Sequence, residues 1–101
     1  MFETASASEL AAAIRRKELG SVELLDLYLS RIERFDGALS AVVTLDVDRA
    51  RAACADADAA VARGDTLGPL HGLPVTIKDA IETEGIVSTG GAVELRAHVP
   101  D

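Results

Sequence analysis

The residue with the most chemical promise is Lys78, which ends the apolar segment Val75–Ile77 and is followed by Asp79. The chain has only two lysines against eight arginines, and a guanidinium group does not release its proton at working pH. An ammonium group can, because burial favours the neutral amine and lowers a pKa that starts at about 10.4. A lysine delivered by a buried strand can therefore act as a base. A structural alternative is that Lys78 reaches water from the strand end or pairs with Asp79.

Three other polar residues have different expected roles. Asp79 is a candidate supporting residue that could orient Lys78, or it could cap the turn that follows. His71 has no second histidine or carboxylate cluster near it in the sequence, so a hydrogen bond within a loop is favoured over a metal site. His98 is expected to have no partner. The sequence predicts no metal site.

Composition limits the partners and the compartment. The chain has 101 residues and a formal net charge of −7, which argues against nucleic acid and against an anionic membrane surface. The single cysteine, Cys54, excludes an internal disulfide and fits a reducing compartment. No secretory signal and no apolar run of the ~20 residues needed to span a bilayer is evident. A cytoplasmic protein is therefore predicted.

Three amphipathic helices are predicted in the first two thirds of the chain. Ser6 and Glu9 have the spacing of a capping box. Ser21 is expected to be the N-cap of the second helix, which should end at Gly37, and Gly64 should end the third. The predicted helices span 6–19, 22–36 and 47–63.

Two short strands are predicted, at 39–45 and 74–78, which gives an α/β fold class. The second strand is predicted to be two-sided and buried, so it needs neighbours on both edges. This chain offers one at most. The partner strands would then lie on another chain or in a longer polypeptide, and the second possibility is favoured.

The block around Lys78 resembles the amidase signature enzymes, which include bacterial amidases, fatty-acid amide hydrolases, allophanate hydrolase and the glutaminase subunit of the glutamyl-tRNA amidotransferase. The similarity extends over nearly the whole chain from about Ser6. It is carried by Gly68–Asp79 (GPLHGLPVTIKD), Thr83–Gly85, Ser88–Gly91, Glu9–Leu10, Ser21–Leu24, Arg31–Ile32 and Ala41–Thr44.

This resemblance implies that residues 1–101 are the N-terminal part of a single amidase-signature domain, with helices and the first strands of a mixed sheet. It also implies hydrolysis of carboxylic amides by a Ser–Ser–Lys triad without a cofactor, in which Lys78 is the ultimate base. A serine hydroxyl is a poor nucleophile until a base removes its proton, and backbone N–H groups stabilise the oxyanion that forms.

One departure from the family pattern is large. The family's two serines lie many tens of residues after the lysine, and Ser88, the only serine of this chain in a glycine-containing loop, does not match their context. Residues 1–101 are therefore expected to be inactive alone, with a small-molecule amide as substrate of the complete enzyme and a homodimer left open.

Two other functions are left open by the sequence. The first is a non-catalytic helical interaction module or truncated remnant. The second is the glutaminase subunit of a tRNA-dependent amidotransferase, although the acidic charge does not favour direct contact with tRNA.

Overall fold

The computed structural model describes residues 2–101. Within this range the elements follow the order η1 (Phe2–Thr4), α1 (Ala7–Arg15), α2 (Ser21–Leu39), α3 (Val47–Arg63) and η2 (Val93–Leu95). The same range contains no strand, and its one isolated β-bridge joins Thr83 to Ile86 across a turn. None of the described helices is both long and apolar enough to cross a membrane.

The first helix begins with the predicted capping box. The backbone N–H of Glu9 donates to Ser6 Oγ (3.2 Å), and the N–H of Ser6 donates to Glu9 Oε2 (2.9 Å). Two otherwise unsatisfied backbone donors are thereby satisfied. The helix ends earlier than residue 19, because the chain turns through Lys17 with a φ of 61°.

The second helix starts differently from the prediction. Its N-cap is Gly20, and Ser21 is the first helical residue, so the N-cap role predicted for Ser21 is wrong. The carboxylate of Asp58, on α3, accepts the backbone N–H groups of Ser21 (2.6 Å) and Val22 (3.1 Å). The carboxylate accepts hydrogen bonds from two N–H groups that lack partners within the helix, and its negative charge interacts favourably with the positive end of the helix dipole.

At its other end α2 continues past Gly37 to Leu39, and Ser40 leaves the helix with a φ of 50°. The Asp36 carboxylate then accepts the N–H groups of Ala41 (2.7 Å) and Val42 (3.1 Å). This local cap occupies backbone groups that a sheet would need. The strand predicted at 39–45 is therefore wrong.

The third helix has the same bounds as the prediction, 47–63, and ends at Gly64 with a φ of 76°. A positive φ at this position is readily adopted by glycine. Cys54 is the one buried residue of α3. It sits on the alanine-rich helix as a small apolar side chain, as expected.

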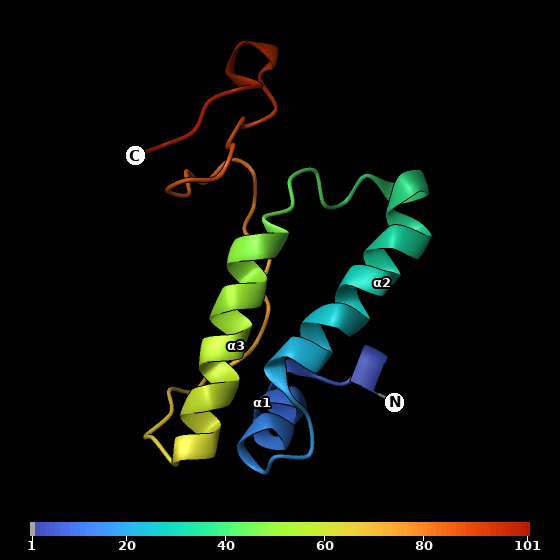
Figure 1. Cartoon of the computed structure of the whole chain (residues 1–101). Coiled ribbons are helices and arrows are strands. Elements are labelled where there is room, and N and C mark those ends of the chain that lie inside the picture. The colour runs from blue at the N-terminus through green and yellow to red at the C-terminus, as the bar shows by residue number, and fades with distance from the viewer. Residues whose placement is uncertain (1) are drawn as a thin grey trace.

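The core lies where α1 meets the beginning of α2. Leu10, Ala13, Ile14, Leu19 and Leu24 form one buried cluster, against which Val61 and Leu73 pack from α3 and the following loop. α2 and α3 lie side by side and are joined by the loop at the end of the molecule away from α1 (Figure 1). After α3 the chain runs back along this helix, and residues beyond 80 extend past its N-terminal end (Figure 1).

The predicted α/β fold class is wrong for the described residues, which form a helical structure without a sheet. The segment predicted as a strand at 74–78 pairs with no other segment, and Val75 and Ile77 are 71% and 53% exposed. A β-branched apolar sequence becomes a strand only when a neighbour satisfies its backbone groups and covers its side chains. Residues 2–101 provide no such neighbour.

Candidate active site

The loop that leads to Lys78 is anchored on all three helices. Three hydrogen bonds make this connection: Arg15 Nη2 to Gly68 O (2.9 Å), Ser21 Oγ to Gly72 O (2.6 Å) and His71 Nε2 to Ala57 O (2.9 Å). Because a carbonyl oxygen only accepts, His71 must carry its proton on Nε2. The predicted role of His71 as a loop hydrogen-bonding residue is confirmed.

Gly72 brings the loop into direct contact with the core. Its φ is +81°, and a Cβ atom built there would lie 3.3 Å from side-chain atoms of Ile14 and 3.4 Å from Ser21 Cβ. Both the backbone conformation and the close approach therefore favour glycine. The next residue, Leu73, packs on the core cluster and fixes where the segment toward Lys78 begins.

Lys78 itself lies on the surface. Its side chain is exposed, and within residues 2–101 its ammonium group makes no hydrogen bond or ion pair. Its carbonyl oxygen accepts the N–H of Ile81 (2.9 Å), which closes a turn. The buried strand expected to carry this lysine is absent, so the described residues alone do not desolvate its amine.

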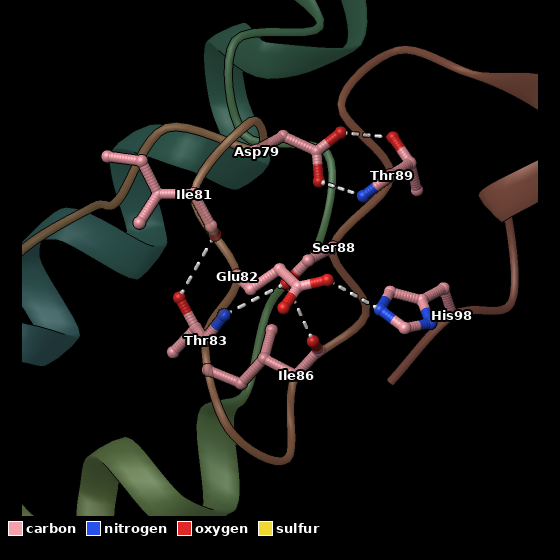
Figure 2. Close-up of polar contacts among 8 residues, drawn as sticks. All are labelled: Asp79, Ile81, Glu82, Thr83, Ile86, Ser88, Thr89 and His98. Carbon is pink, nitrogen blue, oxygen red and sulfur yellow. Dashed lines mark hydrogen bonds and ion pairs between the residues drawn. The ribbon is translucent and has the colours of Figure 1, made fainter. Parts of the chain in front are cut away.

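Asp79 binds a loop ten residues further along rather than Lys78. Its carboxylate accepts the Thr89 N–H (2.8 Å) and, through a short hydrogen bond, the Thr89 hydroxyl, as Figure 2 shows. The Asp79 carbonyl oxygen accepts the N–H of Gly90 (3.0 Å), and Thr89 Oγ1 accepts that of Gly91 (3.1 Å). Three of these hydrogen bonds join residue 79 to residues 89 and 90, and the fourth lies within the loop 89–91; we call the four together the Asp79–Thr89 clasp.

The clasp keeps the carboxylate of Asp79 ionised. The hydrogen bond from the Thr89 hydroxyl lowers the pKa of Asp79 most, followed by the bond from the Thr89 backbone, with smaller contributions from Gly91 and from the charge of Lys78. Desolvation acts in the opposite direction and is outweighed. Hydrogen bonding to the charged form is therefore the main cause, and the neighbouring ammonium is a minor one.

A second set of contacts closes the loop around Ser88, which is 6% exposed. Its hydroxyl donates to Ile86 O (3.0 Å) and accepts the Thr83 N–H (3.2 Å), so it has a structural role here (Figure 2). His98 Nε2 lies 2.9 Å from Glu82 Oε1, and the His98 carbonyl oxygen accepts the Ser88 N–H (2.9 Å). The expectation that His98 has no partner is wrong.

No group of three or more histidine, cysteine, aspartate or glutamate side chains that could hold a metal ion occurs in the described part of the chain. The polar residues around Lys78 instead bind one another and the backbone. What the arrangement offers chemically is a solvent-accessible lysine side chain on a segment between two anchored loops.

The sequence alone did not indicate Thr89 or Asp58. Thr89 is separated from Asp79 by a turn and a loop, and no periodic pattern connects the two positions. The pair Gly90–Gly91 was the only local signal, because adjacent glycines often allow a sharp change of chain direction. Asp58 was hidden by its place within an alanine-rich helix, where an acidic residue usually faces solvent.

Comparison with known proteins gives the family of this chain. The family model described as Amidase matches residues 23–101, which is more than half of the chain. The chain belongs to the amidase family. Lys78, Asp79 and the clasp all fall within the residues that match this family.

Several relatives of this amidase-family chain are named as a subunit of glutamyl-tRNA(Gln) amidotransferase. The protein from Aromatoleum aromaticum is 48% identical over 88 residues, which cover 87% of this chain and 18% of the relative. Those from Anaeromyxobacter sp. and Moorella thermoacetica are both 40% identical, covering 91% and 94% of this chain and 19% and 20% of the relatives. The chain thus spans about a fifth of the length of these relatives.

Proposed function

We propose that this chain is the lysine-bearing portion of a hydrolase of carboxylic amides, in which Lys78 is the base of a Ser–Ser–Lys mechanism. The observation that carries the proposal is the position of Lys78 within the block Gly68–Asp79, inside the residues that match the amidase family. The hydrogen bonds that anchor the loop before Lys78 support the proposal, because a base must be held in place. The side chain is exposed among residues 2–101, so we propose that other parts of the complete enzyme bury it and favour its neutral form.

In this mechanism the neutral amine of Lys78 takes a proton that a relay serine has received from the nucleophilic serine. The nucleophile attacks the amide carbonyl, the leaving nitrogen takes up the proton that Lys78 received, and ammonia or an amine departs. Water then hydrolyses the acyl-enzyme, which releases the carboxylic acid and regenerates the serine hydroxyl. None of the six serines of this chain lies in a sequence context that resembles that of the family's two catalytic serines. They are Ser6, Ser8, Ser21, Ser30, Ser40 and Ser88. We therefore propose that residues 1–101 do not hydrolyse amides by themselves, and that a small-molecule amide is the substrate of the complete enzyme.

The chain can be tested within a relative that supplies the remaining length. A chimera would carry this chain in place of the 88-residue matching segment of the Aromatoleum aromaticum relative, which is 48% identical there. The readout is ammonia released from glutamine, since that relative is named as part of an amidotransferase. The Lys78→Ala chimera should lose at least about 10³-fold in kcat, because the serine then has no base.

Lys17→Ala is the matched control, since it removes the other lysine of the chain from a position outside the block. This chimera should turn over as the parent does. If the Lys78→Ala chimera keeps the parent rate while folding normally, the proposed mechanism is wrong. Turnover by the isolated 101-residue chain that depends on Lys78 would contradict the proposed inactivity.

A second candidate is the amidotransferase subunit itself, because each of the three relatives described above has that name. The net charge of −7 does not favour direct binding of tRNA by this portion. We propose that the complete enzyme acts on a small molecule in the cytoplasm and that this portion binds neither nucleic acid nor a membrane.

A further inference from the structure

We infer that Asp79 is a positioning residue that acts through the clasp: it fixes the Thr89–Gly91 loop beside the backbone of Lys78 and does not act on the lysine charge. The inference rests on the proposed function of Lys78 and adds a role for Thr89, which has no assigned role otherwise. It is carried by the hydrogen bonds of residue 79 and by the absence of any such bond to Lys78 within residues 2–101.

The geometry gives the clasp two parts. The side chain of Asp79 holds both polar groups of Thr89, and its backbone carbonyl holds Gly90. Thr89 Oγ1, oriented by the carboxylate to which it donates, accepts the N–H of Gly91 (3.1 Å). The two glycines have φ values of 59° and 80°, which glycine adopts without strain, so the backbone can follow the path that these hydrogen bonds require.

Lys78 lies directly between the two fixed parts of the chain. On one side the loop 68–73 is attached to the helices, and on the other side Asp79 is attached to Thr89. The segment from Pro74 to Lys78 has no backbone hydrogen bond through its N–H groups in the described structure. The clasp is therefore the nearest fixed point to Lys78, and releasing it should let both the lysine and the glycine loop move.

An ion pair with Lys78 is the competing role for Asp79. Both oxygens of the Asp79 carboxylate are already occupied by Thr89, and no salt bridge joins residues 78 and 79 in the described range. The two roles predict different results for Thr89 substitutions, because an ion pair would not need the threonine hydroxyl.

Amide hydrogen exchange in the 101-residue chain tests the clasp directly. Asp79→Ala and Thr89→Val should each speed exchange of the Gly90 and Gly91 amides by about fivefold, the effect of losing one modest hydrogen bond. Thr89→Ser keeps the hydroxyl and should restore the parent rates. Thr83→Val is the control, because the Thr83 hydroxyl has only a 3.5 Å contact with Ile81 O. Unchanged exchange in the first two variants, or equal acceleration in the control, would overturn the inference.

The chimera described above tests whether the clasp matters for turnover. Asp79→Ala and Thr89→Val should lower kcat on the order of tenfold with little change in KM, since misplaced groups slow the chemical step more than binding. Thr89→Ser should restore kcat, which a purely charge-based role of Asp79 would not predict. If Lys78→Ala abolishes turnover but neither clasp variant affects kcat, the inference fails and the proposed function stands. If Lys78→Ala keeps turnover, the proposed function fails, and the exchange experiment still decides the clasp.

Discussion

At the scale of single residues, two neighbours in the sequence have opposite surroundings. The amine of Lys78 is exposed and has no partner among residues 2–101, whereas both oxygens of Asp79 are occupied. This division suits a site in which one residue reacts and the next holds the backbone. Hydrogen bonds from Thr89 also lower the pKa of Asp79.

The pH dependence of the clasp follows from that direction. A carboxylate whose pKa is lower in the folded state contributes stability above its unfolded pKa, and this contribution is lost as the pH falls through the folded pKa. For Asp79 the loss should therefore occur below the ordinary value of 3.8. The ¹³C shift of the Asp79 carboxyl carbon, followed during acid titration, should show a midpoint below that value.

Thr89→Val should move this midpoint upward, because the largest cause of the lowered pKa is the threonine hydroxyl. Thr83→Val should leave it in place. A midpoint that Thr89→Val does not change would mean that the hydroxyl is not bound to the carboxylate in solution.

At the scale of elements, the helices were predictable and the strands were not. Ser6 with Glu9, Gly64, and the apolar spacing of Leu10 and Ile14 are local signals, and each acts within a few residues of itself. The segment around Val75 has the composition of a strand, but pairing depends on a partner that residues 2–101 do not contain.

The candidate site was also predictable only in part. Lys78 and Asp79 could be found from sequence because they end an unusual block, whereas the Asp79–Thr89 contact depends on how the loop folds back. The start of α2 was mispredicted for a similar reason: its cap comes from Asp58, 37 positions away from Ser21 in the chain. Contacts between residues so far apart in the sequence produce no local sequence pattern from which they could be predicted.

The cap supplied by Asp58 should contribute measurably to stability. Asp58→Ala removes the acceptor for two N–H groups of α2 and should lower the free energy of unfolding by about 1 kcal/mol. Thermal unfolding followed by circular dichroism measures the change. Asp56→Ala is the matched control, since Asp56 lies on the same helix, is exposed and has no partner within the described residues. Equal effects of the two substitutions would show that the cap contributes nothing specific.

At the scale of the whole molecule, stability is concentrated at one end. The buried cluster lies around α1 and the start of α2, while the apolar side chains of Leu39, Val43, Val75 and Ile77 are exposed. The molecule extends over 45 × 31 × 21 Å, so much of the chain lies far from this cluster. Only part of the apolar surface is therefore used for folding of the described residues.

Two substitutions should reveal this asymmetry. Leu24 is 0% exposed, and Leu24→Ala should lower the free energy of unfolding by about 2–5 kcal/mol. Val75 is 71% exposed, and Val75→Ala should change it by no more than about 0.5 kcal/mol. Denaturant unfolding measures both. A large loss for Val75→Ala would mean that this segment is covered in solution, for example by a second copy of the chain.

The buried position of Cys54 makes it a natural probe of local opening of the folded chain. This thiol is 7% exposed and is the only one in the sequence. Because this side chain is nearly covered, a sulfhydryl reagent should label it slowly in the folded chain and faster when local opening exposes it, so the labelling rate reports on opening without an added dye or engineered probe.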